Sequence, residues 1–222
     1  MKRFYRRELL KIFNPTYTTR KTAFSLILFS VLSSLSGCSI FDTQDENTVT
    51  NHQNWELTRL QIQEQTHWSL IGKIGVRTSE ESLTAAINQW IQINDFFEID
   101  LSSTFFGLGA SKLLGNSRFL TLIEAGEEPV SSDQPNTLIE AALGFPLPVT
   151  YLPYWIKGLP APDQTFQIEF NQQGLPSTLK QHHWQLHFSK YHLEQGIPLP
   201  GKIKLERNNI RIILAIKKWT LL

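Results

Sequence analysis

Apolar and polar residues alternate along much of the chain after residue 67, which is typical of β-strands with one buried face. The residues at even positions from Trp68 to Val76, which are apolar or glycine, fall on one face, and Lys73 and Arg77 fall on the other. Similar patterns or short apolar runs predict nine further strands: 83–93, 96–101, 110–114, 118–124, 166–170, 175–181, 182–190, 202–206 and 210–219.

The alternation is less regular in the second of these segments. A regular period of two residues would place Trp90 on the opposite face from Ile87 and Ile91. The segment between the fifth and sixth predicted strands contains no such alternation: residues 126–136 are polar and predict a loop.

Three segments predict helices. Residues 51–65 start at a capping box formed by Thr50 and Gln53. Their apolar residues predict one face that lies on the sheet: Trp55, Leu57, Leu60 and Ile62. Residues 137–143 end at Gly144, and residues 149–157 end at Gly158 with Pro153 in the first turn. About ten strands with two inserted helices predict a mainly β, α+β fold, in which helices cover one side of a large, curled antiparallel sheet.

The start of the chain differs from the rest. Residues 1–21 carry seven basic residues and one acid, and residues 22–35 are apolar, as in a secretory signal peptide. The stretch that follows, Leu35-Ser36-Gly37-Cys38, contains the only cysteine and resembles the lipobox of bacterial lipoproteins. That resemblance implies that Cys38 is acylated and residues 1–37 are removed; the alternative is a free cysteine after a poor membrane helix. Ser39 then points to the outer membrane.

The domain organisation follows from this reading. Residues 1–37 form the signal peptide, residues 38–50 a polar, acidic tether, and residues 51–222 a single domain. Fourteen basic and nineteen acidic residues remain after cleavage, so the mature chain carries a net charge of −5. A mildly acidic chain argues against nucleic acid as a partner.

Candidate catalytic and metal-binding groups are few. The sequence contains neither Gly-x-Ser-x-Gly nor His-Glu-x-x-His. His183 and His187 share a strand face in the predicted fold but lie about 13 Å apart, too far for one metal ion. The acids between Glu124 and Asp133 occupy a polar loop, where nothing favours acid–base chemistry. We therefore expect no enzyme, cofactor or metal.

A pair of aromatic residues, Phe105 and Phe106, lies in a loop bounded by Gly107 and small polar residues. One reading is that one ring packs inward and the other covers a sheet edge. The other is an apolar loop tip that enters a membrane or contacts an acyl chain, which is worth roughly 1.5–3 kcal/mol for one Phe side chain.

The middle of the chain resembles the LolB family, the outer-membrane lipoprotein receptors of the Lol sorting pathway. The residues that carry this resemblance extend from the first helix to the last strand: Trp55, Gly72, Gly144, Pro146, Pro148, Leu152, Trp155, Gly158, Leu159, Pro160, Trp184, Tyr191 and Trp219. The family's protruding loop aligns with Phe105 and Phe106, where Phe105 replaces a proline of the family and Phe106 a leucine.

The resemblance implies an open half-barrel of highly curved antiparallel sheet, capped by helices over an apolar cavity. It implies a monomeric receptor at the outer membrane that takes acyl chains of lipoproteins from a soluble, LolA-like periplasmic carrier and inserts them into the bilayer. Candidate cavity residues are Trp68, Leu70, Ile74, Ile87, Leu152 and Trp155; each is alternatively ordinary core. A lipoprotein that binds small hydrophobic ligands without a carrier is the competing function.

Overall fold

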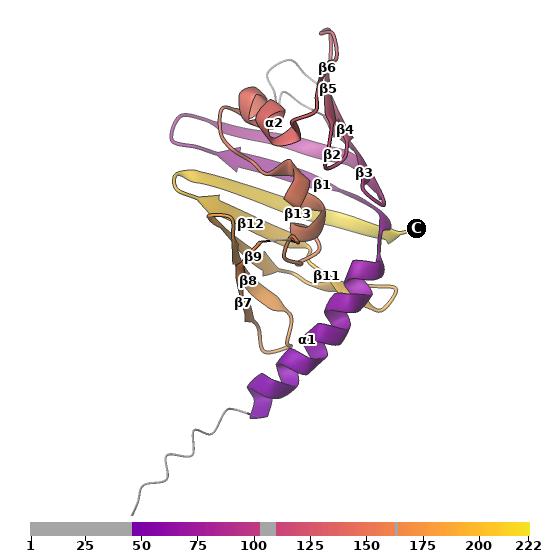
Figure 1. Ribbon diagram of the computed structural model, residues 1–222, viewed down its shortest axis with the longest axis vertical. Helices are drawn as coiled ribbons and strands as arrows, with labels where there is room; N and C mark the ends of the chain where they lie inside the picture. Colours follow the sequence, from indigo (N-terminus) through magenta and orange to yellow (C-terminus); the bar gives the residue numbers. More distant parts are fainter. Residues whose placement is uncertain (1–45, 103–109, 163) are drawn as a thin grey trace, which may run out of the picture. The chain divides into compact units, whose positions relative to one another are not determined.

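The computed structural model (Figure 1) describes residues 46–102, 110–162 and 164–222. Side chains are described from Trp55 onward. These residues belong to one compact unit, residues 44–222. The predicted lipidation site, Cys38, and the predicted loop residues Phe105 and Phe106 lie outside the described residues. None of the helices in the described part is both long and apolar enough to cross a membrane.

In the described part of the chain, the domain is built on one antiparallel sheet of eleven strands. Their order is β6-β5-β4-β3-β2-β1-β13-β12-β9-β8-β7, so within the described residues β6 and β7 are the open edges. The strands are β1 (His67–Arg77), β2 (Ser82–Ile93), β3 (Phe96–Ser102), β4 (Ser111–Gly115), β5 (Leu120–Glu124), β6 (Val130–Ser132), β7 (Phe166–Phe170), β8 (Pro176–Gln181), β9 (Trp184–Ser189), β12 (Lys202–Arg207) and β13 (Ile210–Leu221). The predicted mainly β fold with an open, curved antiparallel sheet is confirmed.

The first and last strands of the sheet lie side by side at its centre. β1 pairs with β13 from Trp68 opposite Leu221 to Arg77 opposite Arg211. Every strand of the β2–β6 half and of the β7–β12 half is therefore joined to the other half through this one pair.

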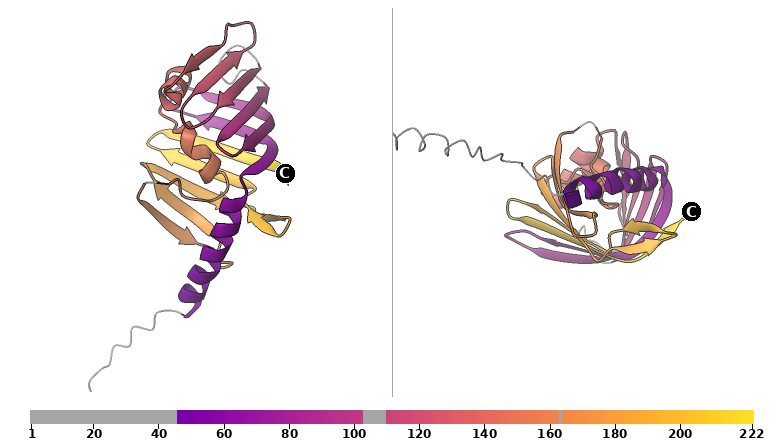
Figure 2. Two further views of the ribbon diagram at one scale, coloured as in Figure 1. Left: turned by 45° about the vertical axis from the view of Figure 1, so that its right-hand side comes forward. Right: turned by 90° about the horizontal axis from the view of Figure 1, so that it is seen from below.

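The sheet curves around one line of irregular pairing. The register shifts between Ile71 and Gly72 against β13, and between Leu70 and Gly72 against β2. A third shift lies between Ile87 and Gln89 against β3. Because a β-bulge bends its strand and increases the local twist, bulges in neighbouring strands curl the sheet toward one face. Figure 2 shows the resulting concave side, which faces the helices.

The segment between the two edge strands crosses this concave side (Figure 2). We call residues 133–162 the cap segment; it contains α2 (Pro135–Leu143), the 3-10 turn η1 (Val149–Tyr151) and α3 (Leu152–Trp155). Gly144 ends α2 in a left-handed conformation, φ 75°, as predicted. The single helix predicted over 149–157 is wrong: Pro153 sits in the first turn of a new, shorter helix after η1.

The first helix, α1 (Glu46–Glu64), begins before the predicted start, within the predicted tether. Trp55 and Ile62 are buried, and the Trp55 ring lies 5.7 Å from the Phe170 ring. Leu57 and Leu60 are 67% and 51% exposed, so the prediction of one shared apolar face is wrong. Residues seven apart share a helix face, whereas Leu57 and Leu60 point away from it.

Three short strands were not predicted. β6 lies inside the predicted loop 126–136, and β10 (His192–Glu194) and β11 (Ile197–Leu199) form a separate hairpin. The predicted strand 182–190 begins only at Trp184, because His182 and His183 form a turn with φ values of 51° and 64°. His183 and His187 therefore do not share a strand face.

Candidate functional site

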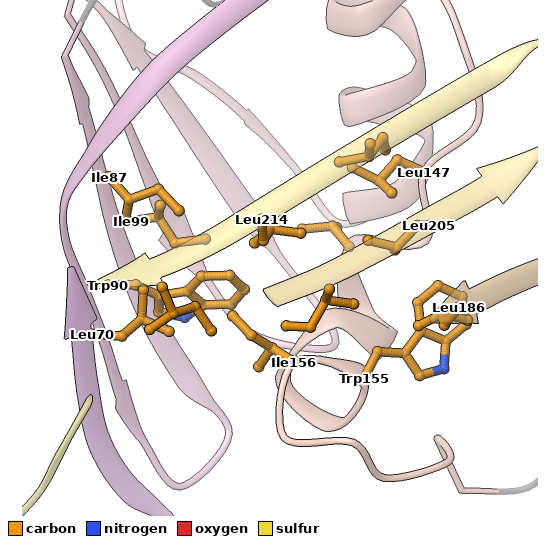
Figure 3. Close-up of a cluster of buried hydrophobic side chains, with 14 of the residues drawn as sticks. Leu70, Ile87, Trp90, Ile99, Leu147, Trp155, Ile156, Leu186, Leu205 and Leu214 are labelled. Carbon is orange, nitrogen blue, oxygen red and sulfur yellow. The ribbon is translucent and has the colours of Figure 1, made fainter. Parts of the chain in front are cut away.

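An entirely apolar cavity lies between the concave face of the sheet and the cap segment. Figure 3 shows part of the buried hydrophobic cluster in this region, including the lining residues Ile87, Trp90 and Leu214. Strands β1, β2, β3, β4, β12 and β13 supply one wall, and α2, η1 and α3 supply the other. The lining residues are Ile74, Ile87, Trp90, Ile99, Leu101, Leu113, Ile139, Leu143, Leu147, Val149, Leu152, Leu205, Ile212 and Leu214. Walls of this kind favour hydrocarbon and offer nothing to an ionic or strongly polar ligand.

The six residues predicted to line an acyl-chain cavity lie in three different surroundings: the cavity, a second apolar space and the closed core. Ile74, Ile87 and Leu152 line the cavity. Trp155 lines a second, narrower apolar space, which also touches Leu152. The remaining pair, Trp68 and Leu70, are 1% and 2% exposed and belong to the core, outside the residues that line either space.

Trp68 belongs to an aromatic cluster at one end of the cavity. Its ring centroid lies 5.6 Å from that of Trp90 and 5.2 Å from that of Trp219. Trp219 donates a hydrogen bond from its Nε1 to the carbonyl oxygen of Pro200, at 3.0 Å. Tilted and edge-on ring pairs of this kind stabilise beyond their buried area, so the cluster fixes this end of the cavity.

The cavity is narrow in this structure. Its volume is about 50 Å³, and that of the space beside Trp155 is about 10 Å³. A dry apolar cavity of roughly 150 Å³ admits benzene, and an acyl chain is larger than benzene. The two walls must therefore separate before an acyl chain can enter.

A wider hollow of about 920 Å³ lies at the turn between β8 and β9. Most of its lining is polar, including His182, His183, Glu206 and Arg207. It lies open to solvent at the sheet edge. An acyl chain placed there would stay largely in water, so the smaller apolar cavity is the better candidate for a lipid site.

One buried amide joins the cap segment to the sheet. Gln181, at the end of β8, is 3% exposed. Its Oε1 accepts hydrogen bonds from Trp155 Nε1 at 2.7 Å and from the Ala161 backbone N–H at 2.8 Å. Its Nε2 donates to the Ala161 carbonyl oxygen at 2.8 Å. The C-terminal part of the cap segment is therefore held firmly to the strands.

A buried lysine adds a second connection. Lys157 is 7% exposed, and its Nζ donates to the carbonyl oxygens of Gln65 at 2.9 Å and Ile62 at 3.3 Å. These carbonyl groups lie at the C-terminal end of α1, where a helix favours a positive charge. Burial lowers the pKa of Lys157 to about 8. Lys157 thus links the cap segment to α1 at the cost of a desolvated ammonium group.

The free energy of unfolding is expected to rise between pH 8 and pH 10. Lys157 loses its proton near pH 8 in the folded state but only near pH 10.5 in the unfolded state. The unfolded state therefore binds more protons in this range, and stability increases with pH by on the order of 2 kcal/mol. Urea unfolding at several pH values within the range measures the slope.

Lys157→Met should abolish most of this slope, whereas Lys180→Met, at an exposed position on β8, should leave it unchanged. The interpretation fails if Lys157→Met retains the slope of the unsubstituted protein.

Three of these features could not be singled out from the sequence. Gln181 and Lys157 are polar residues in segments with no distinctive motif, and their partners lie far away in the chain. Trp90 lines the cavity although its strand pattern placed it opposite Ile87. The other strand residues of the wall, such as Leu205 and Leu214, carry a signal: they lie on the apolar side of regularly alternating strands.

Comparison with known proteins supplies independent information. Residues 66–219 match the family described as outer membrane lipoprotein LolB. The outer-membrane lipoprotein LolB of Pseudomonas fluorescens is 34% identical over 194 residues, covering 87% of this chain and 94% of that protein. The LolB protein of Cellvibrio japonicus is 32% identical over 199 residues, covering 87% of this chain and 97% of that protein. A LolA superfamily protein from Nitrosomonas europaea superposes with a TM-score of 0.49 at 10% identity, covering 74% and 93%.

Proposed function

This chain belongs to the LolB family of outer membrane lipoproteins, and we propose that it receives lipoproteins from a soluble periplasmic carrier and inserts them into the outer membrane. Its place is the outer membrane and its role lies in lipoprotein sorting. In this proposal Cys38 carries the lipid anchor, and the acyl chains of the transferred lipoprotein occupy the cavity between the sheet and the cap segment.

The observation that carries the proposal is the composition of the cavity wall. All fourteen lining residues are apolar, and they come from both the sheet and the cap segment. An acyl chain left in water costs about 0.8 kcal/mol for each CH₂ group. A direct passage from the cavity of a carrier to this cavity avoids that state, so transfer needs no chemical bond to form or break.

We expect the cavity to widen at the α2 end of the cap segment. Gln181 and Lys157 hold the C-terminal end of this segment to β8 and α1. The residues that α2 contributes to the cavity, Ile139 and Leu143, make only apolar contacts there. Moving α2 away from the sheet breaks none of the hydrogen bonds at the other end, so α2 can act as the movable wall.

The direction of transfer depends on relative affinity. The receptor must bind the acyl chains more tightly than the carrier does. The bilayer must in turn bind them more tightly than either protein. The lipid anchor at Cys38 would hold the domain beside the bilayer, which raises the effective concentration for the last step. No energy source is required if each acceptor binds more tightly than the previous one.

A transfer assay tests this function. The mature chain with Cys38→Ala is mixed with a carrier that holds a labelled lipoprotein, without detergent, and the two proteins are separated. The proposal predicts that the label moves to this chain. Label that stays on the carrier, while the folded chain still binds free fatty acid, would instead favour a lipoprotein that binds small hydrophobic ligands.

We further propose that the Phe105–Phe106 loop contacts the bilayer during release. Phe106→Glu should leave acceptance from the carrier unchanged and slow delivery to vesicles about tenfold or more, since one Phe side chain in lipid is worth roughly 1.5–3 kcal/mol. Delivery is measured as the label that co-sediments with vesicles, and Phe106→Leu serves as the apolar control. Normal delivery by Phe106→Glu would exclude this role for the loop.

A further inference from the structure

The convex face of the central strands concentrates positive charge. Seven of the fourteen basic residues after Cys38 lie on the outer side of β1, β12 and β13, together with one of the nineteen acids, Glu206. The seven are Lys73, Arg77, Lys202, Lys204, Arg211, Lys217 and Lys218. This face carries +6 in a mature chain whose total charge is −5.

Five of these residues, Arg77 and four of the lysines, have no acidic partner among the described residues. Glu206 pairs with Lys204 at 2.8 Å and with Arg211 at 2.9 Å, which partly neutralises that end of the face. Lys73 and Lys202 flank Ala215 on the two neighbouring strands, and Lys218 lies opposite Ile71. Lys217 is exposed beside Lys218 at the bulge. We call Lys73, Lys202, Lys217 and Lys218 the lysine patch.

Exposed apolar side chains lie at one end of the neighbouring strands β2 and β3 and directly after β13. Ile93 and Phe96 form a cross-strand pair at the β2–β3 turn and are 46% and 40% exposed. His67 lies opposite Ile93, and the backbone N–H of Leu222 donates to the carbonyl oxygen of His67. Leu222 is 69% exposed. These three apolar residues therefore form a row, the apolar rim, across the ends of neighbouring strands.

We propose that the lysine patch and the apolar rim together form a docking face for a bilayer that contains anionic phospholipids. Positive charge beside exposed apolar side chains is the combination by which proteins bind membrane interfaces. The charge attracts the headgroups, and the rim enters the boundary between headgroups and acyl chains. A soluble acidic partner would complement the lysine patch but would leave the apolar rim exposed to water.

The chain length allows such contact. The stretch from Cys38 to Glu46 spans at most about 30 Å when fully extended, so an anchor at Cys38 keeps the domain close to the bilayer. The anchor alone leaves the orientation of the domain free. Docking through the convex face concerns acceptance and not release: it would turn the concave side, with the cap segment, away from the headgroups and toward an arriving carrier. This inference relies on the outer-membrane location but not on the transfer mechanism.

Vesicle binding without the anchor tests the docking face. Residues 44–222 form one compact unit with its own core, so this unit is added to vesicles of phosphatidylcholine alone or with phosphatidylglycerol. We expect binding only to the anionic vesicles and a loss of binding as salt is raised. Each lysine near such a surface is worth about fivefold in partitioning, so Lys217→Gln/Lys218→Gln should weaken binding roughly twentyfold or more.

A matched control removes the same charge elsewhere. Arg118→Gln/Lys190→Gln changes two exposed basic residues outside the three strands and should weaken binding much less. Phe96→Ser should reduce the binding that persists at high salt. Equal losses in the two double variants would mean that net charge alone acts, and would overturn the proposal. The proposal would also be overturned if the Lys217→Gln/Lys218→Gln variant kept its vesicle binding but accepted lipoprotein from the carrier more slowly. The two lysines would then contact the carrier.

Discussion

Replacing Gly72 with alanine is expected to lower the free energy of unfolding by about 3 kcal/mol or more, a large part of the 5–15 kcal/mol that stabilises a typical domain. A Cβ atom at Gly72 would lie 2.4 Å from the Ala215 carbonyl oxygen and 3.1 Å from the Ile216 Cα. Both are backbone atoms of β13, which cannot move without disturbing the central strand pair.

The same strand offers the control. A Cβ atom at Gly75 would meet nothing closer than 3.8 Å, at Leu83 O and Thr84 Oγ1. Gly75→Ala should be neutral, or stabilise the domain by up to about 1 kcal/mol through the smaller entropy of the unfolded chain. Urea unfolding of both variants measures the difference. If Gly72→Ala proves as stable as Gly75→Ala, the close approach of β1 and β13 at the bulge is not the reason for glycine at position 72.

Replacing Leu152 with glutamate is expected to lower the affinity for a fluorescent fatty acid by about 100-fold or more. Leu152 begins α3 and lines both apolar spaces. An acyl chain in the cavity would exclude water from the new carboxylate, and an unpaired charge in such surroundings costs several kcal/mol. Leu152 is only half-buried, so the carboxylate can stay hydrated in the unliganded protein and the fold should survive.

Tyr154→Glu is the matched control for this variant. Tyr154 belongs to the same short helix, is 37% exposed and lies outside the lining of both apolar spaces. Its replacement should leave fatty-acid affinity within a few-fold of the parent protein, and circular dichroism should report both variants as folded. A folded Leu152→Glu variant that binds fatty acid normally would move the lipid site away from this cavity.

Local patterns predicted most of the sheet. Alternation in segments such as 96–101 and 210–219 reports which side chains face the core, and that information is present in each strand alone. The short edge strand β6 left no such signal, because a three-residue strand with exposed side chains does not alternate between buried and exposed positions. Its pairing with β5 depends on the sheet already formed.

The bulges explain the clearest error within a strand. One extra residue near Asn88 shifts the alternation of β2, so Trp90 and Ile87 point to the same side and both line the cavity. The pattern of apolar residues does not say whether an irregularity marks a bulge or a weakly buried strand. Three of the six predicted cavity residues line the cavity. The sequence shows which residues are apolar, but it does not show where the cap segment crosses the sheet, so the other three could not be excluded.

The central position of β1 and β13 has a consequence for when this domain can form. Trp68 and Leu221 pair although nearly the whole domain separates them in the chain. Contacts of such long sequence separation form slowly, and here they also require β13, the last strand of the sheet in chain order. The strands on either side can pair locally as hairpins, but among the described strands the two halves of the sheet have no other pairing with each other. The two halves of the sheet therefore cannot join before β13 is synthesised. Until then the domain lacks its central strand pair, and an incompletely folded polypeptide can still be threaded across a membrane.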